Sequence, residues 1–246
     1  MTTTPPPVLQ PPATDRPARA NVLLFATGSV ATIKLPLLVG ALLRHPVRVC
    51  VVLSAAAERF LAPADVRALA AAAGVVAVHR DQDEWAGPPA WARGDPVLHI
   101  ELRKWADLML IAPLSANSLA AMAAGLCPSL GLSVVRAWDT TGHRSGGDGG
   151  DDGADQQEKP QHQQQRQPRP PKRILVAPAM NTLMYLHPLT EQQLGVLRGW
   201  GWVRVLEPVD KLLACGDVGV GGMMEVADIV REVVAELGLA GSRPAD

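Results

Sequence analysis

A turn of small residues follows the first apolar run of the chain and is suited to bind an anion. Residues 21–26 read NVLLFA, and Thr27, Gly28, Ser29 and Val30 follow directly before a helical pattern. Gly28 permits a tight turn, and the backbone N–H groups of Gly28, Ser29 and Val30 would point outward from a helix start, where phosphate binds favourably. On this motif alone, an ordinary helix cap is the simpler interpretation.

Three further apolar runs, residues 47–53, 108–111 and 174–177, end in turns of the same kind. The candidate binding side chains in these turns are Ser54, Ser115, Asn117, Ser118, Asn181 and Met184. Helix capping explains one polar side chain per turn, whereas several polar turns on one rim favour a polar ligand. The Asn181 amide is suited to hold a carboxylate without changing its protonation, while Met184 is also typical of flexible core packing.

Two side chains are candidates for moving protons. His99 lies near the start of a predicted helix, and an imidazole exchanges protons near neutral pH, although an isolated histidine is more often structural. Cys215 lies in the glycine-rich segment 211–222, which has the composition of a flap over a site, and a free surface cysteine explains it as well. The histidines and cysteines lack metal-ligand spacing, so we expect no metal site.

The alternation of short apolar runs and helical patterns predicts the architecture. We expect strands over residues 21–26, 47–53, 108–111, 174–177 and 203–206, and helices over residues 31–44, 63–73, 98–106, 115–124, 188–197 and 224–237. Apolar runs with few polar alternations are typical of strands covered on both faces. The pattern therefore predicts a doubly wound α/β fold, a parallel sheet in a three-layer sandwich, with ligands beyond the carboxyl ends of its strands.

Two segments lack the apolar side chains that a core needs. Residues 1–20 are rich in proline, and the 35 residues 139–173 contain no Val, Leu, Ile, Met or Phe. Such segments do not bury enough surface to offset the entropy of ordering them. We therefore expect a disordered proline-rich tail, a disordered low-complexity insertion, and a single domain made of residues 21–138 and 174–246.

Composition and charge exclude several classes of partner. The 246 residues are 48% hydrophobic, and 23 Lys and Arg against 24 Asp and Glu give a net charge of −1, so we expect no nucleic-acid binding. The most apolar stretch, residues 22–43, is interrupted by Gly28, Lys34 and Pro36, so no membrane span is expected. Unpaired cysteines and the lack of a secretory signal indicate a reducing compartment and predict a cytoplasmic protein.

Several long motifs, in order along the chain, resemble the flavin-dependent cysteine decarboxylases, and among them the phosphopantothenoylcysteine decarboxylase family. The motifs are TGSVATIKLP (27–36), DPVLHIELRKWADLMLIAPLSANSLAAMAAGLC (95–127), VVRAWD (134–139), APAMNTLMYLHPLT (177–190) and KLLACGD (211–217). The resemblance implies a flavodoxin-like, Rossmann-type subunit that binds FMN. It also implies a homotrimer with each site between neighbouring subunits.

The resemblance further implies a role for each candidate residue. Gly28, Ser29 and Val30 would hold the FMN phosphate, and the cofactor pocket would be lined by Ser54, Ser115, Ala116, Asn117, Ser118 and Ala179. Asn181 and Met184 would bind the substrate, phosphopantothenoylcysteine. His99 would be the catalytic base or proton relay, and Cys215 the proton donor on the flap. The implied reaction passes through a thioaldehyde and an enethiol and yields 4′-phosphopantetheine for coenzyme A synthesis.

The same resemblance leaves two alternatives. An oxidative relative would stop at the enethiol, as peptide-modifying members do, and Cys215 argues against it. A non-catalytic regulatory subunit that inhibits a protein phosphatase would use the tail and insertion as contacts, but an intact set of enzyme residues argues against that role. The sequence departs from the family at Pro128 and Ser129, usually Asp-Asn, and at Tyr185, usually Trp. Site or subunit contacts are expected to differ there.

Overall fold

The computed structural model describes residues 19–86, 92–141, 171–212 and 218–239. Most of the expected tail (1–20) and insertion (139–173) lie outside these ranges, and their disorder stays a prediction. Within the described ranges, no helix combines the length and the apolar composition needed to cross a membrane.

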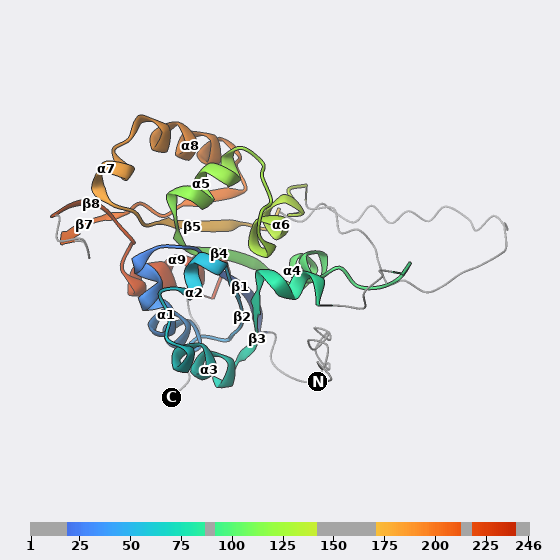
Figure 1. Cartoon of the computed structure of the whole chain (residues 1–246). Helices are drawn as coiled ribbons and strands as arrows, with labels where there is room; N and C mark the ends of the chain where they lie inside the picture. The colour runs from blue at the N-terminus through green and yellow to red at the C-terminus, as the bar shows by residue number, and fades with distance from the viewer. Residues whose placement is uncertain (1–18, 87–91, 142–170, 213–217, 240–246) are drawn as a thin grey trace.

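A six-stranded parallel sheet forms the centre of the fold (Figure 1). Its strands are β1 (Ala20–Ala26), β2 (Val47–Leu53), β3 (Val75–Arg80), β4 (Leu108–Leu114), β5 (Ile174–Pro178) and β6 (Val203–Val205). They lie in the order β3-β2-β1-β4-β5-β6, the order of a Rossmann-type doubly wound sheet, which confirms the predicted fold class. The chain moves outward from β1 to β3 and then returns to β4 on the other side. The strand order therefore reverses between β1 and β4.

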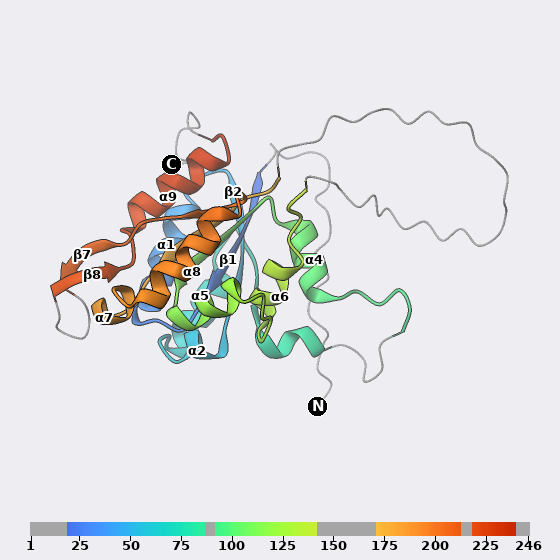
Figure 2. The same cartoon turned by 90° about the horizontal axis from the view of Figure 1, so that it is seen from above.

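Helices cover both faces of this sheet (Figures 1 and 2). One face carries α1 (Leu35–Leu42), α3 (Pro63–Ala71) and α9 (Val226–Glu236), and the other carries α4 (Leu98–Trp105), α5 (Ala116–Ala123), α6 (Leu130–Arg136) and α8 (Pro188–Gly199). Shorter elements are the 3₁₀ helices η1 (Val30–Lys34) and η2 (Asp81–Trp85), the helices α2 (Ala55–Glu58) and α7 (Thr182–Tyr185), and an antiparallel hairpin of β7 (Val209–Leu212) and β8 (Val218–Gly222).

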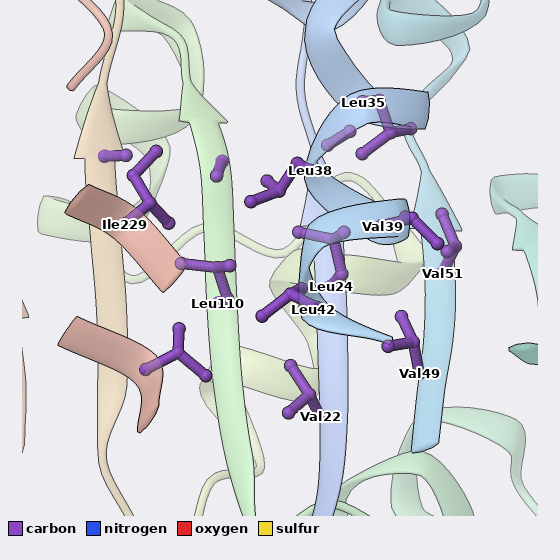
Figure 3. Packing of buried hydrophobic residues seen from close by; sticks show 14 of the residues in the cluster. Val22, Leu24, Leu35, Leu38, Val39, Leu42, Val49, Val51, Leu110 and Ile229 are labelled. Carbon is purple, nitrogen blue, oxygen red and sulfur yellow. The ribbon is translucent and has the colours of Figure 1, made fainter. Parts of the chain in front are cut away.

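Successive side chains of the central strands enter opposite core layers. Leu24 of β1 belongs to the layer under α1 and α9, whereas Phe25 belongs to the layer under the other helices. Figure 3 shows Leu24 and Leu110 of the neighbouring strand β4, with Leu42 of α1 and Ile229 of α9 lying over them. Burial on both faces is the reason that these strands are apolar without alternation.

The elements that the sequence patterns did not predict are short. β3, α2, η2, α6, α7 and the two hairpin strands have four to seven residues each. The helix expected over residues 31–44 is divided into η1 and α1. Pro36, at the start of α1, has no backbone N–H to continue one hydrogen-bond ladder through both.

Trp138, the residue before the expected insertion (139–173), contacts Lys172 near the end of that insertion. The Trp138 indole Nε1 donates to the backbone carbonyl of Lys172 at 2.9 Å. Because loop closure costs little for added length, a long segment between these two points is compatible with the rest of the fold.

Candidate functional site

The turn after β1 presents backbone donors at the edge of the sheet. The Ser29 side chain caps η1 by accepting from the Ala31 N–H at 3.4 Å. Among the described residues, the backbone N–H groups of Gly28 and Ser29 have no acceptor, so both can bind a ligand. A Cβ on Gly28 would lie 2.5 Å from the Ala56 Cβ. Only glycine therefore allows this turn to pack so closely on α2.

Thr27 is a residue of this turn that the sequence reasoning missed. Its side chain is fully buried, and its Oγ1 donates to the Pro113 carbonyl at 2.8 Å and accepts from the Ser115 N–H at 2.7 Å. The hydroxyl thus joins the turn after β1 to the turn after β4. A threonine next to Gly28 was the available signal, but its partner lies 88 residues away in the sequence.

Ser54 starts α2 at the end of β2. Its Oγ accepts from the Ala57 N–H at 3.2 Å. Asp81, the first residue of η2, holds the same helix start, because its Oδ2 accepts from the Ala55 N–H at 3.0 Å. Its Oδ1 accepts from the Leu130 N–H at 3.1 Å. One carboxylate therefore joins the starts of α2 and α6.

The turn after β4 uses two of its polar side chains to cap α5. Ser115 and Ser118 are both buried, and Ser115 Oγ accepts from the Ser118 N–H at 3.3 Å and lies 3.2 Å from Ser118 Oγ. The hydroxyls of both Ser115 and Ser118 therefore take part in capping α5, whereas we expected only one polar side chain of this turn to do so. Asn117 is exposed and Ala116 partly exposed at the same helix start, so they remain candidates to line a ligand site.

The turn after β5 is held from two sides. The Ala179 N–H donates to the Leu114 carbonyl of β4 at 3.0 Å, and the Met180 N–H donates to the Gly221 carbonyl of β8 at 3.0 Å. The second bond joins the β7–β8 hairpin to this turn, and the hairpin lies beside α7 in both views (Figures 1 and 2). The part of the predicted flap segment (211–222) that forms β8 therefore lies at the same edge as this turn.

Asn181 and Met184 lie on the short helix that follows. The Asn181 Oδ1 accepts from the Leu183 N–H at 2.8 Å and so caps α7. Met184 is 50% exposed, which contradicts the core-packing interpretation of its side chain. The structure brings the predicted substrate pair together on one turn.

His99 lies in the first turn of α4 and pairs with Glu84 of η2, which the sequence reasoning also missed. His99 Nδ1 is 2.6 Å from Glu84 Oε1, and the two side chains are 25% and 6% exposed. The other carboxylate oxygen of Glu84 is buried without a hydrogen-bond partner among the described residues. Glu84 stands in the acidic run DQDEW. Nothing in that run distinguishes it from its acidic neighbours.

The cysteines have different surroundings. Cys215 lies outside the described residues, so its role as proton donor stays a prediction. Cys50 is buried in β2, and burial raises the pKa of its thiol to about 12, which keeps it protonated. Cys127 is exposed. Across the described ranges, no group of three or more His, Cys, Asp or Glu side chains is placed to hold a metal ion.

The site turns lie at the carboxyl ends of neighbouring parallel strands. β2, β1, β4 and β5 are adjacent, and the strand order reverses between β1 and β4, where open α/β sheets bind their ligands. The unbonded N–H groups of Gly28 and Ser29 fit a phosphate. This edge therefore suits a phosphorylated cofactor such as a flavin nucleotide.

Comparison with known proteins agrees with this geometry. The sequence profile of the Flavoprotein family matches residues 12–238. The chain belongs to the flavoprotein family. This flavoprotein is 42% identical over 233 residues to the phosphopantothenoylcysteine decarboxylase of Mus musculus, across 94% of this chain and 93% of the mouse protein. The family predicted from the motifs is therefore confirmed.

Solved structures share the fold of this flavoprotein. A cysteine-to-serine mutant of PPC decarboxylase, complexed with pantothenoylaminoethenethiol, superposes with a TM-score of 0.70 at 36% identity and covers 90% of this chain and 100% of its own. The FMN-binding protein AtHal3 superposes with a TM-score of 0.68 at 36% identity and covers 92% of this chain and 100% of its own.

Proposed function

We propose that this flavoprotein binds FMN and decarboxylates 4′-phospho-N-pantothenoylcysteine to 4′-phosphopantetheine in coenzyme A biosynthesis. The observation that carries the proposal is the likeness to the PPC decarboxylase solved with pantothenoylaminoethenethiol, which extends over 90% of this chain. The match to the Flavoprotein family supports a flavin cofactor, and the likeness to the FMN-binding protein AtHal3 supports FMN in particular. The oxidative and regulatory alternatives are not favoured, since the mouse relative of 42% identity is itself a phosphopantothenoylcysteine decarboxylase.

The turns at the carboxyl ends of the strands hold the cofactor in this proposal. The phosphate binds the backbone N–H groups of Gly28, Ser29 and Val30 at the start of η1, where the helix dipole favours negative charge. The remaining lining residues are Ser54, Ser115, Ala116, Asn117, Ser118 and Ala179. When bound, FMN supplies the acceptance and return of a hydride that the loss of carbon dioxide from a saturated carbon requires.

The chain's own side chains bind the substrate and move protons. Asn181 holds the substrate carboxylate through the amide N–H₂ group, because a carboxylate only accepts hydrogen bonds and the amide nitrogen is the donor of this side chain. Met184 packs against the apolar part of the substrate. His99 acts as the base or proton relay, and Cys215 donates the final proton to carbon. Strand β8, which follows residues 213–217 in the sequence, is bonded to the turn that carries Asn181 through the Met180 N–H and the Gly221 carbonyl.

We also propose that the active form is a cytoplasmic homotrimer with each site between subunits. Exposed apolar side chains flank the site turns and support an interface. They are Val30, Ile33 and Leu37 on η1 and α1, and Leu183, Met184, Leu186 and Leu189 on α7, the turn after it and α8. Large exposed apolar patches are typical of protein interfaces. Light scattering of the purified protein should then give three times the 26.0 kDa chain mass, and a monomer would contradict the trimer.

The experiment that tests the function combines a spectrum with an anaerobic assay. The purified protein should be yellow, release FMN on denaturation, and convert phosphopantothenoylcysteine to phosphopantetheine without added reductant. Replacing Cys215 by Ser should still give carbon dioxide and the enethiol, but without oxygen the reaction should stop once the bound FMN is reduced, and admitting oxygen should restore carbon dioxide release. Folded protein that stays colourless with added FMN would refute the proposal. A Cys215→Ser variant that makes saturated product at the normal rate would refute only the role of Cys215.

A further inference from the structure

We propose that Glu84 is a positioning residue that fixes the orientation and tautomer of the His99 imidazole. The carboxylate accepts a hydrogen bond from Nδ1–H, so Nε2 is the nitrogen that takes up or releases the proton. The inference rests on the proposed function, because it concerns how His99 acts in that reaction. It starts from the 2.6 Å separation between His99 Nδ1 and Glu84 Oε1.

The burial of Glu84 gives this contact its weight. The Glu84 side chain is 6% exposed, and a buried carboxylate is costly unless hydrogen-bond donors or positive charge compensate it. Oε1 is bonded to His99, while Oε2 has no partner within the described ranges. Within the part of the chain that the structure describes, the His99 imidazole is therefore the group that compensates the buried Glu84 carboxylate. A carboxylate bond this short is typical of a charge-assisted pair.

Both partners stand on elements that other contacts hold in place. Asp81 ties the start of η2 to the starts of α2 and α6, and Asp83 Oδ2 accepts from the Arg80 N–H at 2.8 Å to cap the same 3₁₀ turn. On the other side, Leu102 of α4 is fully buried in the core. The pair is therefore preorganised next to the Ser54 turn rather than formed between two free surface side chains.

The geometry determines which nitrogen acts. Because a carboxylate is only an acceptor, the hydrogen must reside on Nδ1, and the lone pair of neutral His99 is on Nε2. When Nε2 takes a proton, the donor's bond to hydrogen breaks, an N–H bond forms, and the imidazolium charge lies against the Glu84 carboxylate. No electrons are exchanged in this step. In the serine-protease triad, a buried carboxylate fixes the tautomer and orientation of the catalytic histidine in the same way.

Variants of the FMN-loaded, full-length protein test the proposal. Glu84→Leu removes acceptor and charge, whereas Glu84→Gln keeps an oxygen near Nδ1 and removes only the charge. We expect kcat to fall about 100-fold in Glu84→Leu and about tenfold in Glu84→Gln, with KM and FMN content within about twofold. Glu101→Gln is the matched control, because Glu101 also lies on α4 but pairs with Lys104 at 2.8 Å. Its kcat should stay within about twofold of the wild type.

A double-variant cycle separates positioning from a general effect on structure. If Glu84 acts through His99, Glu84→Leu should cost nothing further in a His99→Asn background. A further tenfold loss there, unchanged kcat in Glu84→Leu, or loss of FMN from both Glu84 variants would overturn the proposal.

Nitrogen-15 NMR of histidine-labelled protein gives a readout that does not need turnover, with the His99 signals assigned by the His99→Asn variant. The wild type should show a protonated Nδ1 and a bare Nε2, and Glu84→Leu should lose this preference. A wild-type Nε2–H tautomer would refute the role of Glu84 even if the decarboxylase assay succeeds. If the assay fails, the tautomer still decides whether Glu84 orients His99.

Discussion

The Thr27 hydroxyl oxygen lies 2.7 Å from the Ser115 backbone nitrogen and ties together the two strands between which the sheet reverses its order. The same hydroxyl donates to the Pro113 carbonyl at 2.8 Å, and the side chain is fully buried. Two of the turns assigned to FMN therefore share one side chain as a spacer. The position of the Ser115 turn relative to the Gly28 turn depends on it.

Replacing Thr27 by Val should weaken both the fold and FMN binding. The variant keeps the side-chain shape but leaves the buried Ser115 N–H without an acceptor, at a cost of about 1–3 kcal/mol in the free energy of unfolding, while the Pro113 carbonyl still accepts from the Thr27 backbone N–H. FMN affinity should fall about tenfold, which corresponds to about 1.4 kcal/mol. Urea unfolding and flavin-fluorescence titration measure the two effects. Thr27→Ser retains the hydroxyl and should behave like the wild type, and wild-type FMN affinity in Thr27→Val would contradict the spacer role.

Replacing Gly28 by Ala should displace the phosphate turn. The added Cβ would lie 2.5 Å from the Ala56 Cβ, so either this turn or α2 has to shift, at an expected cost of about 1–3 kcal/mol. We expect FMN affinity to fall at least about tenfold. Gly40→Ala is the control, because no described atom lies within 4 Å of its Cβ position in α1. That variant should keep its FMN and gain up to about 1 kcal/mol of stability, and equal FMN affinities for the two variants would contradict the steric argument.

The sequence predicted the layers of the fold because their signals are local. The strands β1, β2, β4 and β5 are continuous apolar runs that only a sheet covered on both faces explains, and polar turns follow each of them. β3 was missed although it begins with the apolar run VVAV, because this run is only four residues long and follows closely on the alanine-rich segment 68–73. Five of its six side chains are partly or fully exposed at the edge of the sheet. The hairpin was missed because it is short and rich in glycine.

The site was predicted less completely, because its remaining residues are defined by long-range contacts. Glu84 is one of several acids in a run that resembles a solvated surface, and only the fold brings it to His99, 15 residues later. Thr27 finds its partner 88 residues away. A pattern in the sequence shows which residues can do chemistry, but it does not show which buried hydroxyl or carboxylate orients them.

The stability of the fold should decrease as the pH falls through the titration range of His79. This imidazole is 2% exposed in β3; burial lowers its pKa below the ordinary value, while the Asp83 carboxylate, 3.8 Å away, opposes this in part. The unfolded chain, with a histidine pKa of about 6.5, therefore takes up the proton first. Below that pH, stability should fall with a slope of at most about 1.4 kcal/mol per pH unit until the folded imidazole is also protonated.

Urea unfolding at pH 7.5 and 5.5 measures this dependence for the wild type and for His79→Leu. Other titrating groups contribute to both proteins, so the difference between the two pH dependences isolates His79. The variant should lose less stability than the wild type between the two pH values. An equal loss in both proteins would show that His79 does not contribute to the acid sensitivity.

Replacing Gly221 by Ala should slow turnover without removing FMN. Gly221 has a φ of +120°, a backbone conformation that alanine rarely adopts. Its added Cβ would also lie 2.6 Å from the Met180 carbonyl oxygen, so the β7–β8 hairpin would have to move away from the turn after β5. Because the hairpin flanks residues 213–217, we expect kcat to fall at least about tenfold, a loss equivalent to about 1.4 kcal/mol. FMN content should not change, since the turn that is proposed to bind the FMN phosphate follows β1 and does not contact this hairpin's Gly221 position. Gly195→Ala in α8, with no described atom within 4 Å of its Cβ position, is the control. Equal kcat values for both variants would mean that the hairpin's contact with the substrate turn is dispensable for catalysis.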